Sequence, residues 1–210
     1  LLEEGKQVVL VSDAGTPAIS DPGEDLVRLC IEKNIPVTSI PGPVAAVNAL
    51  ILSGLPTRRF SFEGFLSVNK RHRHEHLNSL KNDPHTLIFY EAPHKLRTTL
   101  DDFSKVFGGD RKIALARELT KIHEEILRMT VSEAVAYYQE QTPRGEYVLI
   151  VEGADENTKQ KEQPWMAWTV REHVDHLIQT GLSQKDAIKE AAKERGVPKR
   201  EVYQAYHIEE

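Results

Sequence analysis

The chain has 210 residues, of which 40% are hydrophobic and 28% are charged, and its formal net charge is -5. This composition is typical of a soluble globular protein with one large domain, or two small ones and an appendage. No apolar run approaches membrane-spanning length, and no segment resembles a signal peptide. The single cysteine, Cys30, excludes a disulfide framework and a cysteine-based metal site, so we expect a cytoplasmic protein. The net negative charge argues against a protein that coats nucleic acid by bulk electrostatics.

The strongest local signal lies near the start of the chain. Residues 8–11 (VVLV) predict a strand buried on both faces of a parallel sheet, because the run is rich in β-branched side chains. Asp21, Pro22 and Glu24 are typical of a capped helix start. Ligands of α/β sheets bind where strands end, so the intervening residues 15–17 (GTP) form a candidate binding loop. A tight crossover turn without a ligand explains the same residues equally well.

A second strand and a second helix follow. Residues 35–40 predict a strand that breaks at the Pro-Gly-Pro of 41–43, and residues 44–53 predict a helix that Gly54 ends. Alanines at positions 45, 46 and 49 of this helix allow the close approach of a ligand or of another element. Tight packing of the helix on a sheet is the plainer interpretation.

Residues 58–153 predict a further α/β unit with a mixed sheet, because several of its strands have hairpin-like neighbours. The expected strands are 60–65, 85–90, 113–119, 124–129 and 146–151, and the expected helices are 69–81, 96–107 and 130–141. Thr130 and Glu133 have the spacing of a capping box at the start of the last helix.

The end of the chain predicts a linker and a small helical unit. Residues 154–163 are charged and rich in amides, with no apolar periodicity. Beyond them, Thr169, Ser183 and Pro198 each begin a predicted helix, in an order that is typical of a helix-turn-helix. Lys199 and Arg200 stand where a nucleic-acid reader needs cations. Because residues 165–210 hold seven Lys and Arg against eight Asp and Glu, a protein-packing role is equally compatible.

Several catalytic motifs are absent. The sequence contains no GxxxxGK[ST] and no GxGxxG, so the letters GTP at 15–17 do not indicate that nucleotide. No Ser-His-Asp arrangement can be derived from spacing. His72 and His76 share a helix face, but further zinc ligands are lacking. A solvated, partly cationic face is the better interpretation of this helix, and its Lys70, Arg71 and Arg73 are candidate phosphate contacts.

Six ordered blocks together resemble the tetrapyrrole-methylase superfamily, and within it the bacterial methyltransferases that modify a cytidine 2'-oxygen of 16S ribosomal RNA. The blocks are SDAGTPAISDPG, SIPGPVAAVNALILSGLP, FEGFL, FYEAPHKL, ARELTKIHEE and RGEYVLIVEG. The resemblance implies a two-lobed α/β fold and a small all-α tail shaped like a helix-turn-helix. The family's opening strand and its glycine-containing loop do not precede Leu1, so we expect an amino-terminal part to be missing. The expected domains are 1–57 and 58–153 (two methylase lobes), 154–164 (linker) and 165–210 (helical tail).

The resemblance also implies S-adenosylmethionine as cofactor, folded into a cleft between the lobes and bound largely through backbone groups. By motif position the cofactor contacts are Gly15, Thr16, Ile19, Val44, Ala45, Tyr90, Ala116, Arg117, Gly145 and Glu146. The reaction is the in-line attack of a ribose 2'-hydroxyl on the sulfonium methyl. Glu118 or Lys121 is the expected proton acceptor, and Arg117 places a phosphate. Lysine can serve only if burial or a neighbouring cation keeps it neutral. An Arg117–Glu118 ion pair between the lobes is the structural alternative.

The expected partners are 16S ribosomal RNA or the small ribosomal subunit, together with a second copy of the chain in a homodimer. No membrane and no metal are expected. Two other functions remain open. One is a tetrapyrrole or other small-molecule methyltransferase of the same superfamily, against which the tail and the basic helix argue. The other is a non-catalytic module that binds nucleic acid or protein through residues 165–210.

Overall fold

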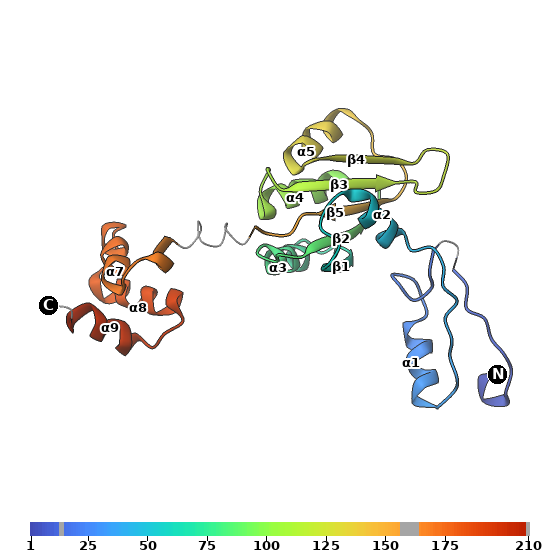
Figure 1. Cartoon of the computed structure of the whole chain (residues 1–210), viewed down its shortest axis with the longest axis horizontal. Helices are drawn as coiled ribbons and strands as arrows, with labels where there is room; N and C mark the ends of the chain where they lie inside the picture. The colour runs from blue at the N-terminus through green and yellow to red at the C-terminus, as the bar shows by residue number, and fades with distance from the viewer. Residues whose placement is uncertain (13–14, 156–163, 209–210) are drawn as a thin grey trace. The chain divides into compact units, whose positions relative to one another are not determined.

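The computed structural model describes residues 1–12, 15–155 and 164–208 of the chain (Figure 1). The chain divides into two compact units, Leu1–Ala154 and Asp155–Glu210. Each unit has its own hydrophobic core.

The first unit is built on a five-stranded mixed sheet with the strand order β1-β2-β5-β3-β4. Its strands are β1 (Phe60–Phe65), β2 (Thr86–Glu91), β3 (Lys112–Arg117), β4 (Glu125–Thr130) and β5 (Tyr147–Val151). β1 and β2 are parallel, and the β2–β5, β5–β3 and β3–β4 pairs are antiparallel. The predicted mixed sheet is therefore confirmed.

Helices cover both faces of this sheet (Figure 1). Helix α2 (Ala45–Ser53) packs on one face, where it meets Ile88, Val148 and Ile150. Helices α3 (Lys70–Leu80), α4 (Leu96–Phe107) and α5 (Val131–Glu140) enclose the other face, which includes Leu87 and Leu149. Because side chains alternate along a strand, these apolar runs supply both cores.

Some alanines of α2 pack on the sheet and one lines a pocket, so both roles considered from the sequence occur. Ala46 and Ala49 are buried against small residues of the sheet, Ala114 and Ala116, so helix and sheet approach closely. Ala45 is exposed and contributes to the pocket described below.

Helices α2, α3 and α5 of this unit begin or end at the capping residues that the sequence predicts. Gly54 ends α2 in the left-handed conformation, with φ 77°. Asn69 caps α3 through the amides of Arg71 and His72. Thr130 and Glu133 form the predicted capping box of α5.

The two strands predicted before residue 45 do not form. Residues 8–11 and 35–40 are extended but lie outside the sheet, and Val9 and Val11 are 79% and 78% exposed. Neither run pairs with any of the five strands within the described residues, although β1 and β4 each have an open edge. An apolar run indicates side chains that can be buried, but a strand also requires a neighbouring strand to hydrogen-bond with its backbone N–H and C=O groups.

The first helix, α1 (Glu24–Glu32), forms without the predicted cap. Its N-cap residue is Gly23, at φ 144°, and no side chain caps it. Asp21 lies two residues too early to cap the helix, and it lines the pocket instead. A short 3-10 helix, η1 (Leu2–Glu4), precedes this region.

In its described residues, the second unit is a bundle of three helices, α7 (Val170–Gln179), α8 (Gln184–Arg195) and α9 (Lys199–Ile208), after the short η2 (Pro164–Ala167). Val174, Ile188 and Val202 form its core with three buried alanines of α8. The predicted caps of α7 and α8 are present, at Thr169 and Ser183. In the part of the chain that the structure describes, every helix is too short or too polar to cross a membrane.

Candidate active site

A pocket of about 420 Å³ opens at one edge of the sheet. β1, β2 and β3 end at this edge, and the antiparallel β5 begins there. The loops before α1 and α2 complete its wall. The lining residues are Gly15, Thr16, Ile19, Ser20, Asp21, Pro43, Val44, Ala45, Asn48, Phe65, Tyr90, Glu91, Ala116, Glu118, Leu119, Thr120, Lys121, Glu146, Tyr147 and Val148.

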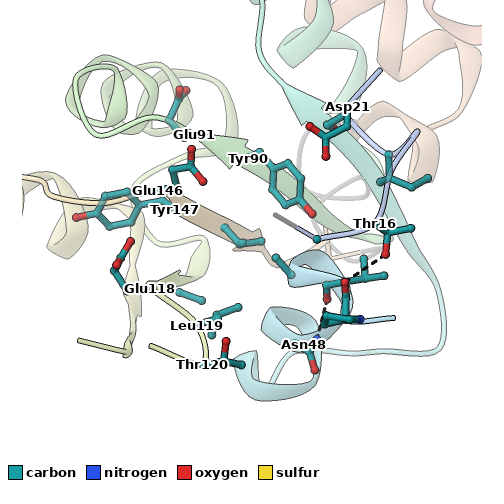
Figure 2. A pocket seen from close by; sticks show the side chains of 18 of the residues that line it. Thr16, Asp21, Asn48, Tyr90, Glu91, Glu118, Leu119, Thr120, Glu146 and Tyr147 are labelled. Carbon is teal, nitrogen blue, oxygen red and sulfur yellow. Dashed lines mark hydrogen bonds between the residues drawn. The ribbon is translucent and has the colours of Figure 1, made fainter. Parts of the chain in front are cut away.

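Tyr90 projects into the middle of this pocket. In Figure 2 its ring lies between the side that carries Thr16 and Asp21 and the side that carries Glu118 and Thr120. The hydroxyl accepts a hydrogen bond from the backbone N–H of Ala46, at 3.3 Å, and so connects β2 to the first turn of α2. Burial raises the pKa of Tyr90, and the charge of Asp21 adds to this increase while the Ala46 bond opposes it. The phenol therefore stays neutral at physiological pH.

Two loops of the pocket have strained backbones. Ala18 and Ser20 have φ values of 67° and 62° in the loop before α1, and Glu118 and Thr120 have values of 51° and 65° after β3. Non-glycine residues rarely adopt this region, and such strain concentrates at binding sites. Thr16 fastens the first loop by donating its hydroxyl to the carbonyl oxygen of Pro43, at 3.2 Å.

The pocket is rich in acidic side chains. Among the described residues, Asp21, Glu91, Glu118 and Glu146 line it, against one basic residue, Lys121. The carboxylate of Glu91 is 2% exposed and accepts hydrogen bonds from the Thr99 hydroxyl, at 2.6 Å, and from the Ala92 amide, at 2.9 Å. The other three acids give the pocket a negative character that favours a cationic ligand.

Glu118 is held in place by two neighbours. Its carboxylate lies 3.3 Å from the ammonium of Lys121, and its side chain is 23% exposed. On the other side it packs on Gly145, where a Cβ atom would lie 2.6 Å from Glu118 Oε1. Gly145 does not line the pocket among the described residues, so its part there is to leave room for Glu118.

Arg117 makes a different ion pair from the one considered from the sequence. Its Nε donates to Glu125 Oε2 at 2.7 Å, across the β3–β4 pair, and not to Glu118. This hydrogen bond raises the pKa of Arg117. The Arg117–Glu118 pair does not form, because Arg117 is the last residue of β3 and pairs with Glu125 of β4, whereas Glu118 lies in the loop that follows and pairs with Lys121. Arg117 is also outside the pocket lining.

The predicted phosphate contacts fall into three groups. Lys70 and Arg71 are exposed at the start of α3, and Lys199 and Arg200 are exposed at the start of α9 in the second unit. Arg73 differs, because its Nε donates to Asp102 Oδ2 at 2.8 Å and its side chain is only 12% exposed. Arg73 therefore joins α3 to α4 and is withdrawn from the surface.

Two histidines of α3 contact acidic side chains, so this helix face is not the fully solvated face that the sequence predicted. His74 lies 3.2 Å from Asp102, and His76 lies 2.7 Å from Glu63. Within the described ranges, no group of three or more His, Cys, Asp or Glu side chains could hold a metal ion.

The structure brings most of the sequence-predicted site into one place. Gly15, Thr16, Ile19, Val44, Ala45, Tyr90, Ala116, Glu118, Lys121 and Glu146 all line the pocket, whereas Arg117 and Gly145 do not. The sequence interpretation missed Asp21, which it took for a helix cap, and Phe65, which lies inside the quoted block FEGFL. The glycine within that block was a signal, since an isolated glycine in a strand indicates a bulge.

The fold and the pocket define an α/β protein with a candidate ligand site where the strands of the sheet end. The family model for Tetrapyrrole (Corrin/Porphyrin) Methylases matches residues 1–135. The chain belongs to this family. A structure described as the methyltransferase CobJ shares the fold, with a TM-score of 0.57 and 21% identity over 73% of this chain and 67% of that one.

Two curated relatives are similar over nearly the whole chain. A protein of Halalkalibacterium halodurans is 50% identical over 208 residues, covering 99% of this chain and 72% of that protein. A protein of Bacillus subtilis is 47% identical over 210 residues, covering 100% of this chain and 72% of that protein. Each is named Ribosomal RNA small subunit methyltransferase I.

Proposed function

We propose that the chain transfers a methyl group from S-adenosylmethionine to the 2'-oxygen of a cytidine ribose in 16S ribosomal RNA. The observation that carries this proposal is the similarity, over almost all of the chain, to proteins named as small-subunit ribosomal RNA methyltransferases. The pocket supports it, because the loops of the six sequence blocks meet there.

The pocket has the properties that S-adenosylmethionine requires. A volume of about 420 Å³ is within the usual range for a cofactor of this size. The sulfonium and ammonium groups of the cofactor are cationic, and the lining acids Asp21, Glu118 and Glu146 carry the opposite charge. Strained loops at residues 15–20 and 118–120 hold backbone amides and carbonyls in the pocket wall, where a folded cofactor can use them. When bound, the cofactor supplies a methyl group already activated toward nucleophiles.

Glu118 is the proton acceptor in this proposal. Lys121 does not meet the requirement for a lysine base, which is burial or a neighbouring cation that keeps the amine neutral. Its side chain is 65% exposed, and it forms an ion pair with the Glu118 carboxylate, which favours the charged ammonium. Glu118 lines the pocket at the end of β3, and packing on Gly145 limits its rotamers. A carboxylate held in this way can accept the hydroxyl proton while the pocket keeps oxygen, carbon and sulfur in line.

The RNA contacts of the proposal use both units. Lys70 and Arg71 of the first unit contact phosphates of the RNA, and Lys199 and Arg200 of the tail contact other phosphates. Residues 1–57 and 58–153 act as the two lobes of the methylase, and residues 165–210 as a separate RNA-binding tail. A cytoplasmic homodimer that acts on the small subunit completes the proposal.

A methyl-transfer assay tests this function. Small ribosomal subunits that lack the modification, naked 16S RNA and uroporphyrinogen are each incubated with the chain and tritiated S-adenosylmethionine. We expect label in ribosomal RNA, at a cytidine 2'-oxygen identified after nuclease digestion. Label only in the porphyrinogen would assign the chain to small-molecule methylation. An absence of transfer, together with no heat of cofactor binding in calorimetry, would leave only a binding module.

A further inference from the structure

Two phenylalanine rings of β1 pack on the Tyr90 ring, which lies in the pocket. The Phe62 and Phe65 rings both contact the Tyr90 ring edge to face, with centroid distances of 5.1 Å and 5.5 Å. Phe65 lines the pocket and is 52% exposed. The Phe65 ring is therefore supported by the Tyr90 ring while about half of its surface remains open to a ligand.

A β-bulge places Phe65 there. In a regular strand Phe62 and Phe65, three residues apart, would point to opposite faces of the sheet. The β1–β2 register pairs Phe62 with Ile88, Gly64 with Phe89 and Phe65 with Tyr90, so one residue is inserted between positions 62 and 64. Gly64 allows this with φ 62°. Both rings therefore share the pocket face, and a bulge beside a site commonly re-aims a side chain in this way.

The inserted residue is itself anchored. Glu63 pairs with His76 of α3 at 2.7 Å, and the Ser61 hydroxyl donates to the same carboxylate. These contacts hold the bulge from the opposite side of the strand. The geometry that turns Phe65 toward the pocket is therefore fixed by side chains of α3 and β1.

Cations follow Phe65 closely along the chain. Lys70 and Arg71 are exposed five and six residues later. Even a fully extended chain limits the Cα–Cα distance between Phe65 and Lys70 to about 18 Å. An open aromatic ring with cations within that reach is the combination that binds single-stranded nucleic acid, since bases stack on the ring and phosphates pair with the cations.

We propose that Phe65 is a positioning residue that stacks on a base of the RNA strand whose ribose enters the pocket. This inference rests on the proposed function and adds to it the group that holds the acceptor. The ligand of the ring is a nucleobase, which the adenine of the cofactor could also supply. We assign it to RNA because Lys70 and Arg71 match a phosphate backbone, and S-adenosylmethionine carries no phosphate.

Kinetic comparison of Phe65→Ala with Phe60→Ala tests the proposal. Phe60 lies on the same strand and is 45% exposed, but it does not line the pocket, so it is a matched control. We expect Phe65→Ala to raise the KM for small subunits roughly tenfold or more, as loss of one base stack does. Phe65→Tyr should restore the KM, and Phe60→Ala should leave it unchanged. Cofactor affinity in calorimetry should be the same in all variants.

The possible results separate clearly. If Phe65→Ala matches Phe60→Ala in an assay where the unmodified chain is active, the stacking role is wrong. If Phe65→Ala weakens S-adenosylmethionine binding in proportion to the rate, the ring serves the cofactor and the RNA assignment is wrong. If the unmodified chain itself transfers no methyl group, the proposed function fails, and the next measurement decides the stacking role.

A fluorescence measurement is independent of activity. The full chain is prepared as Phe65→Trp and as Phe60→Trp, which share the background of the two native tryptophans. Each is titrated with a single-stranded, cytidine-containing pentaribonucleotide in the presence of S-adenosylhomocysteine. We expect added quenching in Phe65→Trp alone, because a stacked base quenches the new indole. Equal quenching in the two variants would overturn the proposal.

Discussion

At the scale of single residues, the pocket depends on backbone conformations that most side chains avoid. Gly15 has φ 76° at its edge, and a Cβ atom added there would meet nothing within 4 Å. We expect Gly15→Val to abolish cofactor binding and leave the fold intact, because a β-branched residue forces the loop out of this conformation. Calorimetry with S-adenosylmethionine measures the loss.

Gly5 provides the control for that variant. It has φ 79° and equally open surroundings, but it does not line the pocket. Gly5→Val should retain the affinity of the unmodified chain, with a similar small loss of stability. Unchanged affinity in Gly15→Val would show that this loop does not contact the cofactor.

Glu118 gives a prediction about the reaction itself. Glu118→Gln keeps the shape of the side chain but removes its capacity to accept a proton, so kcat should fall about a hundredfold or more. The affinity for S-adenosylmethionine should fall much less than kcat, because Asp21 and Glu146 still give the pocket a negative character. Single-turnover methyl transfer measures the rate, and a rate within twofold of the unmodified chain would exclude Glu118 as the base.

The Arg73–Asp102 pair gives a prediction about stability. Asp102→Ala leaves a nearly buried guanidinium without its carboxylate partner, which costs about 3 kcal/mol of unfolding free energy. Glu75→Ala breaks the exposed Arg71–Glu75 pair of the same helix and should cost less than about 0.5 kcal/mol. Urea unfolding followed by circular dichroism measures both, and equal losses would contradict the difference in burial.

At the scale of elements, the sequence predicts those helices and strands whose signals are local. The capping boxes at Thr130 and Thr169 define helix starts because the side chain and the amide that it satisfies lie three residues apart. The runs at 8–11 and 35–40 were mispredicted because strand formation depends on a partner that no local pattern names. Phe65 was missed because simple alternation along β1 places it on the wrong face, and only the bulge corrects this.

The tail bundle has an element that should respond to acid. His173 of α7 is 1% exposed, stacks on Trp165, and lies 2.8 Å from Glu194 through Nε2. Its Nδ1 accepts a hydrogen bond from Arg195 Nε at 3.0 Å, so a second proton on the ring would face a cation. Burial lowers the pKa of His173 below 6.5, despite the opposing effect of Glu194.

The sign of the pH dependence follows from that lowered pKa. The unfolded tail gains a proton on His173 below about pH 6.5 while the folded tail resists it, so stability is fully present above this pH and falls as the pH drops. Both tryptophans of the chain lie in the tail, at positions 165 and 168, so their fluorescence reports its unfolding. The urea concentration at the unfolding midpoint of the tail should be lower at pH 5.5 than at pH 7.5. The variant His173→Gln should lose this pH dependence, whereas the control His207→Gln should retain it. An unmodified chain whose urea midpoint does not change with pH would contradict the prediction.

At the scale of the whole molecule, the ligand pocket and the helical tail belong to different units. Every lining residue of the pocket precedes Ala154, and the core of the tail is formed entirely by residues after it. A chain that ends at Ala154 should therefore bind S-adenosylmethionine with unchanged affinity.

The same truncation should weaken the use of RNA. Loss of Lys199 and Arg200 removes phosphate contacts, so the KM for small subunits should rise and its dependence on salt should become less steep. Transfer assays at several salt concentrations measure both effects. Lys199→Ala with Arg200→Ala in the full chain should reproduce much of the effect. An unchanged KM in the truncated chain would instead assign the tail a packing role.

The strand order has a consequence for how the protein is made. β5 is the central strand of the sheet, between β2 and β3, yet it is the last strand to be synthesised. Until Val151 has emerged from the ribosome, the β1–β2 pair and the β3–β4 hairpin have no common strand to join them. The sheet of the first unit therefore closes late in translation, and two apolar half-sheets must stay apart from other nascent chains until then.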